Sequence, residues 1–143
     1  MTTLLESAAR TESGTFVVPT PLPADVLAGV FQLTVSAAAT EVGDTLDVYI
    51  QHSVDDGVTY DDFIHFTQVL GNGGAKKFVA RWVPLGAAPE AELAAPQDAA
   101  MSAGVLQQPI GPNLRIKWAI TDASTDNASF TFGVAAAFMK GRA

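Results

Sequence analysis

Residues 113–139 read NLRIKWAITDASTDNASFTFGVAAAFM, and this stretch decides the fold class. Apolar residues alternate with polar or small ones in two runs, one on each side of a turn-forming segment at 122–127. The apolar positions are Leu114, Ile116, Trp118 and Ile120 in the first run, and Phe130, Phe132, Val134, Ala136 and Phe138 in the second. Such alternation is typical of a strand with one buried face. The stretch therefore predicts two antiparallel neighbours joined by a short turn.

The same period of two recurs along the rest of the chain, at residues 15–18, 31–35, 46–50, 62–69 and 78–82. Turn-forming segments separate several of these runs, at 42–44, 55–57 and 71–74. Links this short require antiparallel neighbours, because a parallel return needs a crossover of about a dozen residues or more. No segment carries a convincing helical stripe. The sequence thus predicts an all-β fold: an antiparallel two-sheet sandwich, jelly-roll-like, with about eight strands.

Two segments interrupt this pattern. Residues 84–112 contain five prolines among many alanines, and loops beyond roughly 15 residues are uncommon in compact domains. We expect a long Ala/Pro-rich loop there, either a contact arm or a mobile excursion, with a short helix possible within 90–101. Residues 1–14 are expected to form an N-terminal arm that a partner orders. The predicted division is this arm followed by one sandwich domain at 15–143.

The composition bounds the chemistry. The 143-residue chain has no cysteine, which removes thiolate nucleophiles, disulfides and cysteine-based zinc sites. Its net charge of −7 and its eight scattered Lys and Arg residues argue against direct nucleic-acid binding. No apolar run reaches the roughly 18 residues of a membrane span, and the first residues lack the pattern of a signal peptide. We expect a protein that is made in the cytoplasm and does not bind membranes.

The surface is expected to be partly covered by other protein. Charged residues make up 16% of the chain, against about 25% in an ordinary soluble domain. Hydrophobic residues make up 48%, and a small domain cannot bury all of them. A surface with so little charge is what a subunit packed against neighbours would have. The composition therefore predicts a homo-oligomer.

The most specific local motif is SVDDGVTY at residues 53–60. It resembles the Asp-box, S-x-D-x-G-x-T-W, with tyrosine in place of tryptophan. In proteins that carry this motif the aspartate braces a hairpin turn, the glycine adopts a positive φ and the aromatic residue packs over the loop. The resemblance assigns these structural roles to Asp55, Gly57 and Tyr60. One copy of the motif predicts a turn and no sialidase activity.

The acidic residues at 55, 56, 61 and 62 could suggest a calcium site, but side chains alternate along strands and cannot all converge. We expect a solvated acidic turn. His52 and His65 could suggest a metal pair, yet the expected register places His65 opposite Val48, on the order of 13 Å along the ribbon from His52. Two histidines are also an incomplete ligand set. No metal site and no cofactor are predicted.

No catalytic constellation can be assembled from these residues. The sequence lacks the common nucleophile and metalloprotease motifs. An enzyme would require a cleft that gathers His65 with Asp47 or Asp62. The prediction is a protein without catalytic residues.

Several residues are candidates for an interface. Trp82 and Trp118 stand in phase with the apolar faces of their strands, so we expect them in the core. Arg81, Arg115 and Lys117 point to the opposite faces, where they would meet acidic groups of a neighbouring copy or water. The two irregular segments supply the apolar candidates. The full candidate set is Leu4, Leu5, Arg81, Leu85, Met101, Val105, Leu106, Arg115 and Lys117.

Residues 46–66, LDVYIQHSVDDGVTYDDFIHF, together with the 113–139 stretch resemble small structural proteins of tailed bacteriophages. Within that group, a single sandwich of this size looks most like a capsid decoration, or cement, protein. The resemblance implies a virion protein on the capsid exterior, made in the host cytoplasm, whose partner is the major capsid protein and which forms a homo-oligomer, most often a trimer.

Two alternatives stay open. One is a phage head-completion or tail structural protein, because the resemblance does not separate these classes. The other is a carbohydrate-binding or adhesive β module, since jelly rolls often bind sugars on exposed aromatic platforms. Tyr49 and Tyr60 are the residues that such a module would use.

Overall fold

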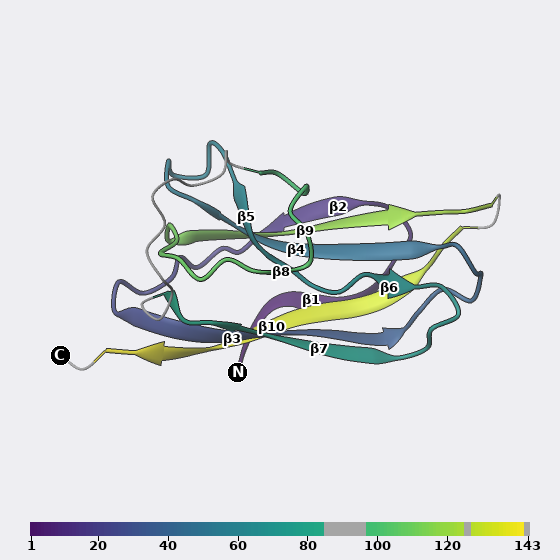
Figure 1. Cartoon of the computed structure of the whole chain (residues 1–143), viewed down its shortest axis with the longest axis horizontal. Helices are drawn as coiled ribbons and strands as arrows, with labels where there is room; N and C mark the ends of the chain where they lie inside the picture. The colour runs from purple at the N-terminus through teal and green to yellow at the C-terminus, as the bar shows by residue number, and fades with distance from the viewer. Residues whose placement is uncertain (85–96, 125–126, 142–143) are drawn as a thin grey trace.

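The computed structural model describes residues 1–84, 97–124 and 127–141. They form two antiparallel sheets packed face to face, so the predicted all-β sandwich is confirmed (Figure 1). The strands are β1 (Thr2–Arg10), β2 (Gly14–Val17), β3 (Val26–Ala37), β4 (Thr45–Ser53), β5 (Asp61–His65), β6 (Val69–Leu70), β7 (Lys76–Trp82), β8 (Gly104–Val105), β9 (Asn113–Thr121) and β10 (Phe130–Lys140). No helix in the described part of the chain is long and apolar enough to cross a membrane.

The four-stranded sheet has the order β1-β10-β3-β7. The six-stranded sheet has the order β2-β9-β4-β5-β8, and β6 also pairs with β4. All of these pairs are antiparallel. A jelly-roll path stays a prediction.

The links themselves differ from expectation. Only the turn at 55–57 joins two paired strands, β4 and β5. The segments at 42–44, 71–74 and 122–127 each connect a strand of one sheet to a strand of the other, so they are not hairpins. A short link fixes only the direction of the next strand. The sheet that the strand joins is decided by where its apolar face is buried.

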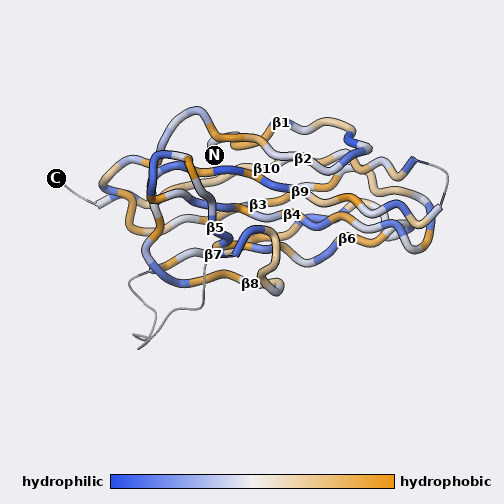
Figure 2. The backbone as a smooth tube through the Cα atoms, turned by 90° about the horizontal axis from the view of Figure 1, so that it is seen from above, coloured by the Kyte–Doolittle hydropathy of each residue, from blue (hydrophilic) through white to orange (hydrophobic). Residues whose placement is uncertain are grey.

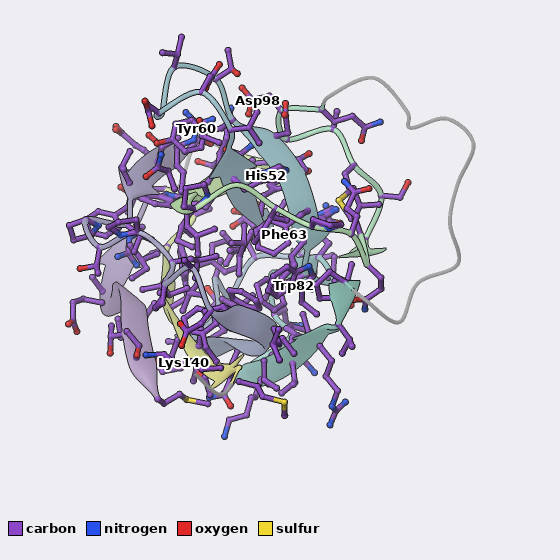
Figure 3. All side chains as sticks on the ribbon, turned by 90° about the vertical axis from the view of Figure 1, so that its left-hand side faces the viewer. His52, Tyr60, Phe63, Trp82, Asp98 and Lys140 are labelled. Atoms are coloured by element: carbon purple, nitrogen blue, oxygen red, sulfur yellow. The ribbon has the colours of Figure 1, made fainter. Side chains whose placement is uncertain are left out.

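The core lies between the inner faces of the two sheets. Phe31, Phe63, Phe130 and Phe132 are fully buried there. Phe63 makes edge contacts with Phe31, at 5.6 Å between ring centroids, and with Trp82, at 6.2 Å (Figure 3). Trp82 is buried as expected, whereas Trp118 packs against the margin of the core. The alternation that predicted these faces is visible along the strands in Figure 2.

The N-terminal segment is a core strand and not an arm. β1 pairs with β10, and Leu4 and Leu5 are each only 4% exposed. The register shifts between Thr3 and Leu5, and a bulge of this kind turns two successive side chains to the same side. Both leucines can then enter the core, so neither is available as the interface residue that was predicted.

The second irregular segment is tied to the six-stranded sheet over its described part, residues 97–112. β8 pairs with β5, and the Asp62 N–H donates to the carbonyl of Gln97 at 2.7 Å. Residues 97–101 are not helical. Residues 85–96, which include Leu85 and most of the expected helix, lie outside the described residues.

Candidate functional site

Polar side chains gather on the outer face of the six-stranded sheet, across β9, β4 and β5. Gln51 stands between Arg115 and Asp62 in the strand register, and Tyr49 stands between Lys117 and His65. Their neighbours along the strands, such as Ile50 and Ile116, point into the core. We call Gln51, Asp62, Asp98, Arg115 and Lys117 the polar ladder. Residues 97–103 lie over it and supply Asp98.

Asp62 is the most enclosed charged group of the polar ladder, with 3% of its surface exposed. Its carboxylate accepts hydrogen bonds from three successive backbone N–H groups, those of Ala99, Ala100 and Met101, at 2.8, 3.0 and 3.1 Å. The amide of Gln51 donates a fourth, at 2.8 Å. A buried carboxylate is tolerated because its oxygens are satisfied in this way. The expectation of a solvated acidic turn therefore fails at Asp62, although Asp55 and Asp56 are exposed.

Gln51 connects Asp62 to the basic residues. It is fully buried, its Nε2 also donates to Asp98 at 2.7 Å, and its Oε1 accepts from the Nε of Arg115 at 2.7 Å. Asp98 accepts from Lys117 at 2.8 Å and from Arg115 at 3.3 Å. The hydrogen bond from Lys117, and then that from Gln51, hold the pKa of Asp98 below its ordinary value. Arg115 and Lys117 thus bind Asp98 of their own chain. The sequence had placed them against acidic groups of a neighbouring copy or against water.

His65 and Asp47 do meet, as an enzyme reading would require. The Nε2 of His65 lies 2.9 Å from the Oδ1 of Asp47, and the Nδ1 lies 2.8 Å from the carbonyl oxygen of Met101. Tyr49 stacks on the ring, with 4.1 Å between centroids. Both ring nitrogens already face oxygen atoms of the protein, and one ring face is covered. The arrangement leaves no ring nitrogen to take a proton from a substrate or to bind a metal.

The two tyrosines that a sugar-binding module would use are not free platforms. Tyr49 is 7% exposed. Burial raises its pKa, and the nearby charges of Asp47 and Asp62 raise it further. The guanidinium carbon of Arg115 lies 4.2 Å from the centroid of the Tyr60 ring. His65 and Arg115 therefore each cover one face of a tyrosine ring that a sugar-binding module would use.

His52 lies on the other face of the sheet, inside the sandwich. Its Nδ1 accepts a hydrogen bond from the N–H of Gly111 at 2.9 Å, and its ring contacts the edge of Phe63 (Figure 3). His65 pairs with Tyr49 and not with Val48, because the register shifts after Ile50. The two histidines thus face opposite sides of the sheet and form no metal pair.

The state of His52 predicts a pH dependence of stability. Burial lowers its pKa below the ordinary value of 6.5, so the unfolded chain takes up a proton at a higher pH than the folded chain. The stability that neutral His52 supports is complete above pH 6.5 and is lost as the pH falls from there through the folded-state pKa. His52→Asn keeps an acceptor for Gly111 but does not titrate. Between pH 6.5 and the acidic range in which Asp55 and Asp98 titrate, this variant should show a smaller slope of unfolding free energy against pH than the unchanged protein, measured by urea unfolding.

A matched control uses the other histidine. His65→Gln should retain the pH dependence that His52 causes, because it leaves the Gly111 contact intact. If His52→Asn and the unchanged protein have the same slope of unfolding free energy against pH, His52 is not the group responsible.

The turn at 53–60 has the hydrogen bonds expected of an Asp-box-like hairpin. Asp55 accepts from the N–H and the hydroxyl of Thr59 at 2.9 and 2.6 Å, and from the hydroxyl of Ser53 at 2.7 Å. These bonds, those from Thr59 first, lower the pKa of Asp55 to about 2. Gly57 has a φ of 84°, and the Tyr60 hydroxyl lies 3.1 Å from where a Cβ at Gly57 would be. Asp55, Gly57 and Tyr60 therefore have the turn-building positions that the Asp-box resemblance implies.

Gly57→Val should destabilise the domain by roughly 1–3 kcal/mol, because a β-branched residue is strained at a positive φ. Thermal unfolding measures the effect. Thr59→Val is an informative companion, since it removes only the hydroxyl bond to Asp55. An unchanged melting temperature for Gly57→Val would show that the turn does not need a left-handed residue.

Three carboxylates at one end of the sandwich are close enough to share a cation. Oxygens of Glu41, Asp44 and Asp122 lie within 4.8 Å of one another, beside a cavity of about 300 Å3. Each already accepts a hydrogen bond in the links between the sheets: Glu41 from the Ser124 hydroxyl, Asp44 from the Ala123 N–H and Asp122 from the Ser124 N–H. Their contacts give them a role in holding these links.

The predicted interface residues separate into two groups. Leu4, Leu5 and Met101 are buried, and Val105 packs partly against the core. Arg81 and Leu106 are exposed. The polar ladder was not predicted as a unit, because its members come from strands and a loop that are distant in sequence. Comparison of the chain with models of protein families, with curated proteins and with solved structures finds no match.

Proposed function

We propose that this chain is a non-enzymatic structural protein of a phage virion, which binds the outside of the capsid lattice and stabilises it. The observation that carries the proposal is the outer face of the four-stranded sheet. Small or uncharged side chains occupy its outward positions on β3 and β10. They are Ala28, Val30, Gln32, Thr34, Ser36, Thr131, Gly133, Ala135, Ala137 and Met139.

These side chains form one continuous surface, because Ala135 pairs with Gln32, Ala137 with Val30 and Gly133 with Thr34. No second layer covers this side of the sheet in Figure 1. The part of the face formed by β3 and β10 carries no charges, and Lys77 and Arg81 of β7 lie at its border. Such an uncharged surface can pack closely on another protein, since no charged group within it has to be desolvated. The resemblance to phage structural proteins supplies the kind of assembly, with the major capsid protein as the partner.

The polar ladder supports the same proposal from the opposite side. Its charged groups bind one another and the backbone at 97–103, so they stabilise the domain. A protein that stabilises a shell acts by binding the mature lattice more tightly than any other state of the shell. A rigid domain suits this role because its binding surface keeps one shape.

The experiment is co-sedimentation with empty capsids built from the major capsid protein of the same phage. The chain should saturate expanded capsids and should not bind unexpanded ones. Gln32→Glu, on the uncharged face, should weaken binding, whereas Glu6→Gln on the exposed part of β1 serves as a control. Binding to head–tail connectors or tails in place of capsids would move the protein to the head-completion or tail class. Binding to a glycan array would favour the adhesive module.

The oligomeric state is a separate prediction. We expect the purified protein to form a homo-oligomer, most simply a trimer, because the uncharged face and the low charge content favour association of copies. Light scattering at tens of micromolar protein measures the mass directly. A monomer under these conditions that also fails to assemble on capsids would contradict the proposed function.

A further inference from the structure

Among the residues that the structure describes, β7 is the one long, regular edge strand without a partner on its outer side. β6 and β8 have two residues each, and β2 has four before the chain reaches Pro19. β1, the other edge of the four-stranded sheet, has two register shifts, and the guanidinium of Arg10 binds its carbonyls at Glu6 and Ala8. β7 pairs with β3 over seven residues without a shift. Bulged, short or capped edges resist pairing with other chains, so β7 is the edge that can accept a strand.

An amide side chain already makes strand-like hydrogen bonds at one end of this edge. Gln107 accepts from the N–H of Val83 at 2.6 Å and donates to the carbonyl of Arg81 at 2.7 Å. Both groups point away from β3. Because alternate residues of a strand point their backbone groups to the same side, Val79 and Lys77 present theirs on this edge too. The Gln107 side chain covers only the far end of it.

A groove runs along the same edge. A cavity of about 290 Å3 is lined by residues 78–81 of β7, by residues 65–67 and by residues 103–105. β7 belongs to the four-stranded sheet and β8 to the six-stranded one, so the groove lies between edges of the two sheets. Phe66, Phe78 and Val105 make its inner wall apolar. A strand added to β7 would therefore place every second side chain in this groove and the others beside the outer face.

The positive charge of the β7 edge determines which kind of added strand would bind there. Lys76, Lys77 and Arg81 all belong to β7, and among the described residues none of them forms an ion pair. The chain as a whole carries a net charge of −7, so this is a local concentration of the opposite sign. Two copies joined through β7 would bring like charges together across the new pair, which is unfavourable. Edge lysines commonly prevent that kind of pairing.

We propose that the β7 edge binds an extended segment of a partner protein in which acidic residues alternate with small apolar ones. The backbone groups of Lys77 and Val79 pair with the added strand. The acidic side chains lie beside Lys77 and Arg81 on the outer face, and the apolar ones fill the groove. This edge borders the uncharged face, because Lys77 pairs with Thr34 and Arg81 with Val30.

The probe is a fluorescein-labelled peptide of alternating Glu and Val, as long as β7, tested by fluorescence anisotropy with the full chain. It should bind, and added salt should weaken binding. Two control peptides separate the causes: alternating Lys and Val has the wrong charge, and alternating Glu and Pro keeps the charge but cannot pair as a strand. Neither should bind measurably. Absence of Glu–Val binding, or equal binding of the Glu–Pro peptide, would overturn the proposal.

Two variants locate the site. Val79→Pro removes a backbone donor on the free edge, where proline is tolerated, and should weaken Glu–Val binding by roughly tenfold or more. Lys77→Glu with Arg81→Glu should reverse the preference toward the Lys–Val peptide, whereas Lys140→Glu, outside β7, should not. If Val79→Pro fails to fold, the variant with Lys77→Glu and Arg81→Glu tests the proposal alone. If that variant still prefers the Glu–Val peptide, the proposal is contradicted. An oligomer that Val79→Pro dissociates would assign the edge to a second copy instead.

Discussion

Deletion of residues 1–12 is expected to unfold the domain or to leave it with little stability. The deletion removes all of β1, whose two leucines are each 4% exposed. Burying one leucine side chain contributes about 1.5–3 kcal/mol, and a domain of this size has a total stability of only about 5–15 kcal/mol. The deletion also leaves β10 paired with β3 alone and removes the Glu12 carbonyl to which the Trp118 indole donates at 2.8 Å.

Urea unfolding followed by tryptophan fluorescence measures this loss, because Trp118 lies next to the deleted segment. Leu5→Ala reports the core contribution alone and should cost about 2–5 kcal/mol. Thr2→Ala, at an exposed position of the same strand, should change stability by less than about 0.5 kcal/mol. A truncated chain that melts like the full one would mean that β1 contributes nothing to the core.

The strands that the sequence predicts well are those with unbroken alternation. β3 and β10 bury every second residue over most of their length, and β9 does so over its first half. In β4 the hydropathy alternates, but every residue from Val48 to Ser53 is buried, because the polar ladder and residues 97–101 cover the outer side chains. Period two is a direct consequence of strand geometry, so it survives in the sequence wherever a strand is regular. The sequence did not predict β1, because two adjacent leucines do not fit the alternation of a regular strand. The bulge between Thr3 and Leu5 accounts for them, but it is visible only in the structure.

A second bulge explains the error at β5. Ile50 pairs with Ile64, but Gln51 pairs with Asp62, so Phe63 is the extra residue. Phe63 enters the core beside Ile64, whereas the alternation expected over residues 62–69 would turn these two neighbours to opposite faces. The same register shift makes Tyr49, and not Val48, the pairing partner of His65. Bulges depend on tertiary packing, and neither of these two carries a glycine or proline that would have signalled it.

The polar ladder could not be predicted because its contacts are long-range. Gln51 binds Asp98, 47 positions away, and Arg115, 64 positions away. Asp98 lies in the segment that the sequence marked as a loop, and nothing near it indicates which strand it covers. The turn at 53–60 is the opposite case, since all its hydrogen bonds join residues at most four positions apart. The hydrogen bonds of the turn could therefore be predicted from the sequence, whereas the long-range contacts of the polar ladder could not.

Asp62→Asn is expected to destabilise the domain by roughly 2–4 kcal/mol. The substitution keeps the shape of the side chain but replaces one acceptor oxygen with an NH2 group. That group would face backbone N–H donors of residues 99–101 and the amide of Gln51, so donors would oppose donors. In the folded state, the backbone at 97–103 should loosen first, because the Asp62 carboxylate binds three of its amides.

Urea unfolding measures the free energy, and hydrogen exchange at the amides of Ala99, Ala100 and Met101 measures the loosening. Asp56→Asn is the matched control: Asp56 is exposed and has a φ of 58°, a conformation that asparagine tolerates. It should change neither quantity appreciably. Fast exchange at these three amides in the unchanged protein would contradict the structural role of Asp62, since amides bound to a buried carboxylate exchange only when the segment opens.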